Sequence, residues 1–76
     1  MTDLTGRHPG TTGILRHFEF AHLPPHLADI SERFHDLAHD LVAILPDGPE
    51  LTTALRKLLE AKDCAVRARL DADREE

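Results

Sequence analysis

The sequence has 76 residues, of which 41% are hydrophobic and 30% charged, and its formal net charge is -5 at pH 7. A chain this short buries only about 60% of the surface that it exposes when unfolded, so we expect one small domain that gains stability by self-association. The single Cys64 excludes an internal disulfide framework, and no apolar run reaches the roughly 20 residues that a membrane span needs.

The composition also bears on partners and compartment. Proteins that bind DNA or RNA polymers are usually basic, whereas this chain is acidic, so we expect no polymer binding. A small phosphorylated ligand needs only two or three well-placed Arg side chains and stays compatible with the charge. The lone cysteine suits a reducing compartment, and the first 27 residues lack the pattern of a secretory signal. We therefore expect a cytoplasmic protein.

The N-terminal part of the chain has few side chains that could pack into a core. Residues 1–15 contain three Gly, one Pro and four Thr, which indicates a flexible arm. Residues 16–20 alternate in a short extended pattern that places Phe18 and Phe20 on one side. Pro24 and Pro25 then lead into a helix, because Pro is tolerated in a first turn.

Two helices follow. The first is predicted over about 26–45, with a 3-4 spaced apolar seam, and it stops at Pro46. Asp47 and Glu50 fit a capping box that starts a second, antiparallel helix over about 49–71. The seam of the first helix is Leu27, Ile30, Phe34, Leu37, Leu41 and Ile44, and the matching line on the second is Leu51, Leu55, Leu58, Lys62, Ala65 and Arg69.

The predicted organisation is a flexible arm (1–15), a helical hairpin domain (16–71) and a charged tail (72–76). The fold class is all-α, an antiparallel two-helix hairpin with an extended N-terminal segment. The apolar surface of the second helix is too broad for one partner helix, so we expect the hairpins to oligomerise. Acidic residues dominate the first helix and basic residues the second, which predicts pairing across the hairpin or between copies.

Metal binding and catalysis have weak sequence support. His35 and His39 are four residues apart, as a zinc pair requires, but a stable site needs a third ligand and the seam assignment places both rings away from the core. Cys64 and Ser31 lie inside helices without features that activate a nucleophile, and the four glycines form no phosphate loop. We expect neither a metal site, nor a cofactor, nor an enzyme.

The residue types that suit a nucleotide ligand occur in two places. Arg16, Phe18 and Phe20 combine a cation for phosphate with rings for stacking, although the two rings alternatively cap the open end of the hairpin core. On the second helix Arg56, Glu60 and Arg67 form part of a polar stripe. The two guanidinium groups lie roughly 16 Å apart along the axis, too far to clamp one phosphate, so they would act at separate sites or with other copies.

These segments together resemble the helical-hairpin domain of the phage anti-CBASS and anti-Thoeris proteins, which act as cyclic-nucleotide sponges. The resemblance covers about residues 16–70 and rests on "FEF", then His22 with Pro24 and Pro25, and on "LP", Glu50 and the run "ALRKLLEA" at 54–61. It implies a compact homo-oligomer, typically a hexamer, in the cytoplasm of an infected bacterial host. It also implies binding of cyclic dinucleotides, cyclic trinucleotides or cyclic ADP-ribose-type signals between subunits without cleavage.

The resemblance also implies site residues. Phe18 and Phe20 match the family's aromatic segment, and Lys57 and Glu60 match its "KLLEA" run. Arg67 lies near a position late in the second helix that is basic in some members of the family. This chain departs from the family at residues 63–67, where many anti-Thoeris members carry aromatic and amide residues, so the identity of the ligand stays open. The alternative function is a protein–protein adaptor that docks another protein on its apolar face and binds no small ligand.

Overall fold

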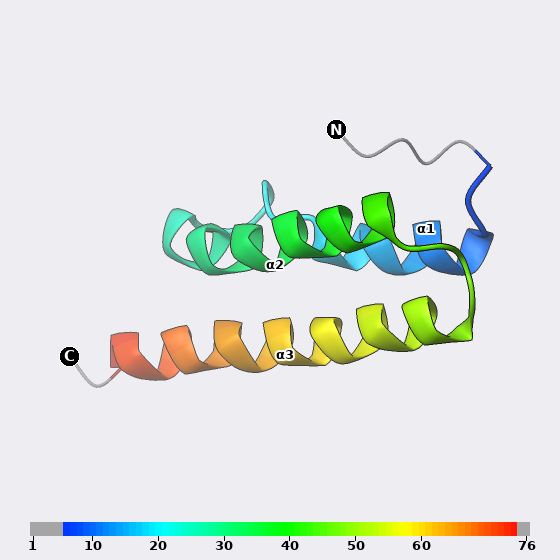
Figure 1. Ribbon diagram of the computed structural model, residues 1–76. Coiled ribbons are helices and arrows are strands. Elements are labelled where there is room, and N and C mark those ends of the chain that lie inside the picture. The colour runs from blue at the N-terminus through cyan, green and yellow to red at the C-terminus, as the bar shows by residue number, and fades with distance from the viewer. Residues whose placement is uncertain (1–5, 75–76) are drawn as a thin grey trace.

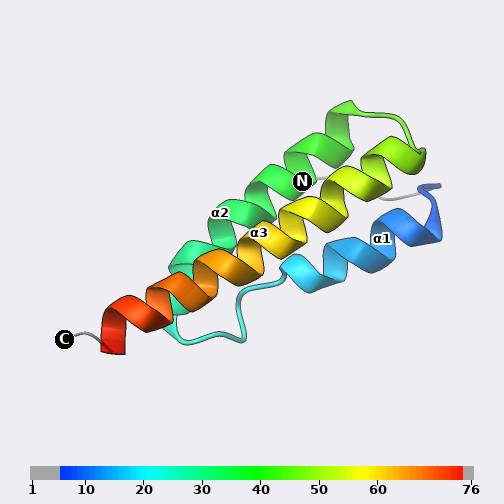
Figure 2. The same cartoon turned by 90° about the horizontal axis from the view of Figure 1, so that it is seen from below.

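The computed structural model describes residues 6–74, and all regular structure in this range is helical. The elements are α1 (Pro9–Leu15), the 3₁₀ helix η1 (Arg16–Phe18), α2 (Pro25–Ile44) and α3 (Pro49–Arg74). Figures 1 and 2 show α2 and α3 side by side and running in opposite directions, while α1 lies against both. The all-α prediction is therefore confirmed, and α1 is a third helix that the sequence analysis did not predict.

The bounds of the two long helices follow from their prolines. Each helix begins with Pro at its first position, where the missing N–H costs nothing (Pro25 and Pro49). The chain leaves the helical conformation at Leu45, immediately before Pro46. The far end of α3 extends through Arg74, so residues 72–74 of the predicted tail belong to the helix; residues 75 and 76 lie outside the described range.

The core lies where the three helices meet. Phe18, Val42 and Leu55 are fully buried. Leu15, Ala38 and Leu51 complete the buried cluster, and half-buried apolar side chains pack around it. The line predicted for α3 is confirmed at Leu51 and Leu55, which are buried, and its four later members are half-buried.

The predicted arm is wrong for residues 9–15. Thr11 and Leu15 lie one turn apart on one face of α1, both are buried, and Phe18 continues the same face. The Gly and Thr content suggested a flexible segment, but this spacing of three core contacts outweighs the low helix propensity of the glycines. Residues 1–5 of the predicted arm lie outside the described residues.

Residues 16–20 are not an extended segment throughout. Arg16–Phe18 form η1, which turns Phe18 into the core and leaves Phe20 half-buried. The end of η1 is held from α3, because Lys62 donates from Nζ to the His17 carbonyl oxygen at 2.7 Å. This contact explains why Lys62 lies on the inward line of α3 with only 13% of its side chain exposed.

The seam predicted for α2 is confirmed only in part: Phe34 packs against the core and Leu27, Ile30 and Leu41 are half-buried, but none of its members is buried. The buried residues of α2 are Ser31, Ala38 and Val42. In contrast, Leu37 is 46% exposed and Ile44 is 76% exposed. Small side chains let α2 approach its neighbours closely, so Ser31 and Ala38 occupy the contact face while larger residues flank it. The apolar spacing of α2 includes only large side chains, so it does not identify Ser31 and Ala38 as contact residues.

Candidate functional site

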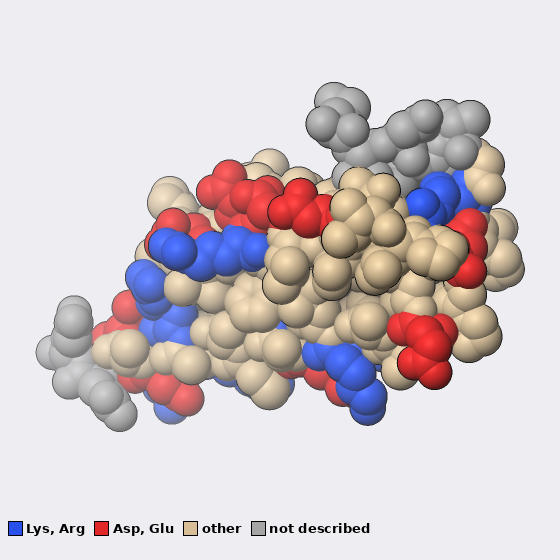
Figure 3. Space-filling view, viewed as in Figure 1, with Lys and Arg blue, Asp and Glu red and all other residues tan. Residues whose placement is uncertain are grey.

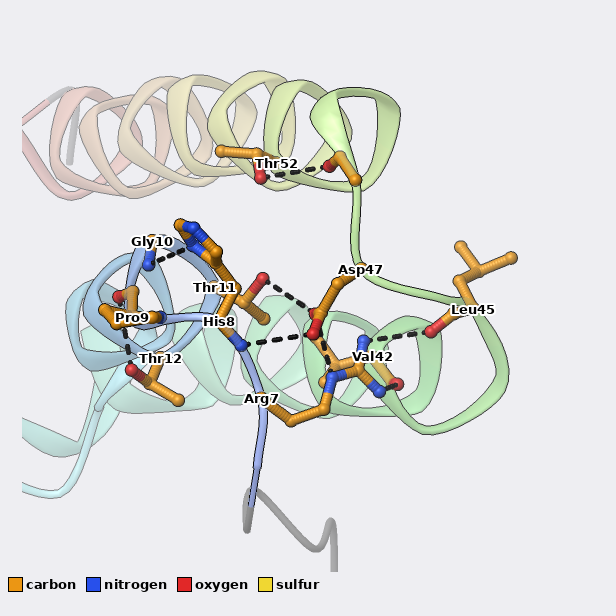
Figure 4. Close-up of polar contacts among 11 residues, drawn as sticks. Arg7, His8, Pro9, Gly10, Thr11, Thr12, Val42, Leu45, Asp47 and Thr52 are labelled. Atoms are coloured by element: carbon orange, nitrogen blue, oxygen red, sulfur yellow. Dashed lines mark hydrogen bonds and ion pairs between the residues drawn. The ribbon is translucent and has the colours of Figure 1, made fainter.

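The N-terminal segment is fastened to the turn between α2 and α3 by one carboxylate (Figure 4). Asp47 Oδ1 accepts from Arg7 Nε at 2.9 Å and from Thr11 Oγ at 3.3 Å, and Asp47 Oδ2 accepts from the His8 backbone N–H at 3.1 Å. The predicted capping role of Asp47 is therefore wrong: in the described residues its hydrogen bonds go to residues 7, 8 and 11 rather than to the start of α3. We call this arrangement the Asp47 clamp.

Arg7 also closes the end of α2. Its guanidinium donates from Nη1 to the Val42 carbonyl at 2.8 Å and from Nη2 to the Leu45 carbonyl at 2.9 Å. The last turn of a helix leaves carbonyl groups without intrahelical partners, and a cation is favoured there by the helix dipole. One side chain thus satisfies the end of α2 and neutralises Asp47.

The clamp changes the acidity of Asp47. Desolvation raises the pKa of this carboxyl group, but the hydrogen bonds from the His8 N–H and the Arg7 side chain, together with the Arg7 charge, outweigh it. The pKa of Asp47 therefore lies below its ordinary value, and Asp47 carries its charge through the whole neutral range.

A groove of about 580 Å³ opens beside the clamp, between the N-terminal segment and the first turns of α3. We call it the Arg56 groove; it is lined by His8, Asp47, Gly48, Pro49, Thr52, Thr53 and Arg56. Arg56 is exposed and makes no ion pair with any carboxylate of residues 6–74. Of the residues predicted to bind a ligand, Arg56 is the one that reaches this groove.

A second hollow lies near the other end of α3. This Arg67 groove, of about 450 Å³, is lined by Cys64, Arg67, Ala68, Leu70, Asp71 and Arg74. Arg67 donates to the Cys64 sulfur at 3.3 Å, whereas Asp71 is paired with Arg74 at 3.5 Å. Arg67 is thus the cation of this groove that forms no ion pair with a carboxylate of residues 6–74.

Phe20 lines a third, smaller hollow of about 310 Å³ with Glu19, Ala21, His22 and His35. Its ring meets His35 edge-on, with centroids 5.0 Å apart. His35 in turn lies 4.3 Å from His39, centroid to centroid. Burial and the neighbouring His35 lower the pKa of His39 below its ordinary 6.5, against the opposite effect of Asp36 and Asp40. Within residues 6–74 no three His, Cys, Asp or Glu side chains are grouped to hold a metal ion.

Of the four remaining residues that were predicted to bind a ligand, one is buried in the core and three are exposed on the surface. Phe18 is fully buried, so it cannot stack on a ligand, and its alternative role in the core is the correct one. Arg16 is exposed, and Lys57 and Glu60 form an exposed ion pair at 3.8 Å outside the three hollows. A single copy therefore distributes the predicted site residues over separate places rather than assembling one pocket.

The expected segregation of charge is present on α2, which is mainly acidic, but not on α3, which carries six basic and five acidic residues. Figure 3 shows acidic side chains gathered over α2, where Asp29, Glu32, Asp36 and Asp40 are exposed. Among the described residues, the single contact between a basic side chain and a carboxylate that joins α2 to α3 is His26 Nε2 with Asp73 at 3.0 Å; the other such contacts on these helices lie within one helix. The predicted pairing across the two helices is therefore nearly missing within one copy.

The residues that sequence reasoning missed are Arg7, His8 and Thr53. The triplet at 7–9 carried a usable signal, because a polar residue followed by Pro is typical of a helix start. Comparisons of the chain with protein-family models, with curated proteins and with solved structures find no match. None of the helices in residues 6–74 combines the length and apolar character that a membrane crossing requires.

Proposed function

We propose that this protein is a sponge that binds and sequesters cyclic nucleotide signals in clefts completed by association of several copies. The ligand class comprises cyclic dinucleotides, cyclic trinucleotides and cyclic ADP-ribose-type molecules. The protein holds these molecules without cleaving them, because sequestration requires affinity for the ligand and no catalysis. In this proposal the protein acts in the cytoplasm of an infected bacterium, where it withholds the signal from the host's anti-phage defence.

The observation that carries the proposal is the placement of two unneutralised guanidinium groups. Arg56 and Arg67 each line an open groove, and neither has a carboxylate partner in residues 6–74. A phosphodiester is the counter-charge that such a cation recognises, through charge-assisted hydrogen bonds that are roughly twice as strong as neutral ones. Because the two grooves share no residue, they are proposed as separate phosphate contacts, each completed by a neighbouring copy.

Association is supported by what one copy leaves uncovered. Leu37, two turns before the end of α2, and Ile44 and Leu45, at its end, are large apolar side chains, and each is more than a third exposed. On α3, Arg56, Arg67 and Arg69 form no ion pair with a carboxylate of residues 6–74, so acidic side chains of a neighbouring copy can pair with them. Both features favour contact between copies, with a hexamer as the assembly that the family resemblance implies.

The role of each candidate residue follows from its position. Arg16, Arg56 and Arg67 are proposed to contact phosphates, and Phe20 is the ring available for stacking on a base. Lys57 and Glu60 lie outside the hollows, so they enter the proposal only as contacts supplied across an interface between copies. Phe18 is removed from the site because it is buried.

Isothermal titration calorimetry against a panel of cyclic dinucleotides, cyclic trinucleotides and cyclic ADP-ribose isomers tests the proposal. We expect binding of at least one class, with recovery of the intact ligand by chromatography. Arg56→Gln should weaken that binding by about tenfold, the cost of one charge-assisted contact. The charge-matched control Arg33→Gln removes an exposed cation of α2 that lines neither the Arg56 groove nor the Arg67 groove, and this variant should bind as the parent does. Absence of binding below about 100 µM across the panel contradicts the proposal.

A protein–protein adaptor is the second candidate function, and the exposure of Ile44 favours it. A side chain that is 76% exposed at the end of a helix, next to an apolar groove lined by Leu45, Pro46, Leu51 and Ala54 among others, suits a docking surface. If the protein is an adaptor, calorimetry detects no binding of any cyclic nucleotide, and the purified chain is monomeric by light scattering. The Ile44→Asp variant then fails to capture a stoichiometric partner protein that the parent captures.

A further inference from the structure

Two side chains from distant parts of the sequence face the same groove. His8 comes from the N-terminal segment and Arg56 from the second turn of α3, and both line the Arg56 groove. Figure 4 shows the His8 ring directed from the start of α1 towards the start of α3. The groove therefore exists in this form only while the N-terminal segment is docked.

The hydrogen bonds of His8 fix which ring nitrogen is a donor. Its Nδ1 accepts from the Gly10 backbone N–H at 2.9 Å, which caps α1. The neutral ring must then carry its proton on Nε2, so Nε2–H is left to donate to another group. Gly10 leaves room for this arrangement: a Cβ at that position would lie 3.1 Å from His8 Nδ1, a tight contact that the ring would have to relieve by a small shift.

The donors on α3 point to the same class of ligand. Thr53 and Arg56 are three residues apart, so both side chains lie on one face of the helix and both line the groove. The hydroxyl of Thr52 is already used, because it donates to the Gly48 carbonyl at 3.1 Å. An imidazole N–H, a hydroxyl and a guanidinium thus surround a space of about 580 Å³, and a phosphate group offers the acceptor oxygens that match all three.

Asp47 also lines the groove, and its negative charge opposes an anionic ligand. Both of its oxygens accept hydrogen bonds from the N-terminal segment, and Arg7 supplies the compensating charge at 2.9 Å. Its contact with the His8 backbone holds the residue that carries the imidazole donor. Asp47 therefore acts on the groove through His8.

We propose that the Arg56 groove binds a phosphate group through His8 Nε2, the Thr53 hydroxyl and the Arg56 guanidinium, with Asp47 as the positioning residue that docks His8. This inference deepens the proposed function, on which it rests for the natural ligand, a cyclic nucleotide. Docking of the N-terminal segment and phosphate binding then stabilise one another, because the ligand binds the docked state alone.

The test is an NMR titration of the ¹⁵N-labelled full-length protein with inorganic phosphate at constant ionic strength. The amide signals of residues 48–56 should shift with a saturable dependence on phosphate. His8→Asn keeps a capping oxygen for the Gly10 N–H but removes the Nε2 donor, and it should weaken phosphate binding by about tenfold, as should Arg56→Gln. Arg33→Gln should bind as the parent does.

Asp47→Asn separates positioning from simple electrostatics. If the carboxylate only repelled phosphate, removing its charge would tighten binding. Because it docks His8, we expect the variant to bind phosphate more weakly than the parent, with faster hydrogen exchange at the amides of residues 11–15. Tighter binding of phosphate by Asp47→Asn overturns the positioning role. If this variant fails to fold, judged by circular dichroism, His8→Asn still decides the assignment, since its backbone contact with Asp47 is retained.

The outcomes distinguish this inference from the proposed function. Cyclic nucleotide binding that is unaffected by His8→Asn contradicts the phosphate site and leaves the sponge function standing. Saturable phosphate shifts at residues 48–56 without binding of any cyclic nucleotide support the site and contradict the sponge function. No phosphate-dependent shift at residues 48–56 overturns the site.

Discussion

The Arg7 guanidinium and the Asp47 carboxylate, forty residues apart in the chain, meet at 2.9 Å and tie the first residues of the fold to its central turn. The same guanidinium reaches two carbonyl groups at the end of α2. The Asp47 clamp therefore couples three segments: the entry to α1, the exit from α2 and the turn before α3.

Arg7→Gln should destabilise the protein by about 1–3 kcal/mol, because the carbonyls of Val42 and Leu45 lose a charged donor and Asp47 loses its counter-charge. Urea denaturation followed by circular dichroism measures the effect. Arg33→Gln is the control, since its partner Asp29 lies 3.8 Å away on an exposed helix surface. A loss of stability as small as that of the control would show that the clamp adds nothing.

Acid should release the clamp. Hydrogen bonds to its charged form hold the pKa of Asp47 below the value of 3.8 that it has in an unfolded chain. Its contribution is fully present above pH 4 and is lost as the pH falls through the lower, folded-state pKa, because the unfolded state binds the proton first. Thermal melting between pH 2 and 5 should show a shallower pH dependence for Asp47→Asn than for Glu32→Gln, an exposed acid of α2. Equal slopes contradict this prediction.

His39 should make the fold sensitive to mild acid. Burial and the neighbouring His35 depress its pKa below 6.5 in the folded state, so between the folded and unfolded values the unfolded chain binds more protons. Stability is therefore complete above about pH 6.5 and falls as the pH drops through the folded-state pKa. His39→Gln should flatten the stability curve over that interval, whereas His17→Gln, at an exposed position, should not. The measurement is urea denaturation at a series of pH values.

Leu55 should be among the most sensitive core positions. Its side chain is fully buried between the helices, so Leu55→Ala should cost about 2–5 kcal/mol, enough to unfold much of a domain of this size. Leu70 lies on the same helix but is 41% exposed, and Leu70→Ala should cost less than about 1 kcal/mol. Equilibrium denaturation of the two variants compares buried and exposed leucine directly.

Ser31 offers a stabilising substitution. Its hydroxyl is buried on the contact face of α2 and has no hydrogen-bond partner. Ser31→Ala removes the cost of burying that group and should raise stability by about 1 kcal/mol. Ser31→Val enlarges the side chain at a close helix contact and should lower stability, which makes it a control for volume. A destabilised Ser31→Ala variant would mean that the hydroxyl is bonded in solution.

Association should depend on the exposed end of α2. Ile44→Asp places a charge on a side chain that is 76% exposed in one copy, so it should leave the helical content of the chain intact while preventing copies from packing there. Multi-angle light scattering should show a smaller species than the parent forms. Ala72→Asp, an exposed change at the far end of α3, should leave the assembly unchanged. An unchanged mass for Ile44→Asp excludes this surface from the interface.

The parts of the fold that the sequence predicted are those set by local chemistry. Pro46 and Pro49 bracket the turn, and the 3-4 spacing that begins at Leu51 and Leu55 identifies the inner face of α3. The contact face of α2 was predicted only in part, because it uses Ser31 and Ala38, which carry no strong hydrophobic signal. Packing of small residues is decided by the partner helix, and no local pattern reports it.

The candidate site was predictable only in part for a related reason. Arg56 stands out from its charge and helical spacing, but its neighbour His8 reaches the groove through a contact between residues 8 and 47. The local motif around Asp47 is typical of a helix cap, but its carboxylate accepts hydrogen bonds from the distant residues Arg7 and Thr11 instead. Phe18 looked like a ligand contact and proved to be core, since ring chemistry is the same in both settings.

Lys62 forms a hydrogen bond with the end of η1, and Asp47 forms hydrogen bonds with the start of the described chain. The segment from Arg7 to Phe18 is therefore attached to the rest of the fold at both ends. A chain shortened to begin at Arg16 would lack the buried Thr11, and it would also lose Leu15 from the cluster that this residue forms with Val42 and Leu55. Purification tags and fusion partners are therefore best joined by a linker that leaves Arg7 and the residues after it intact.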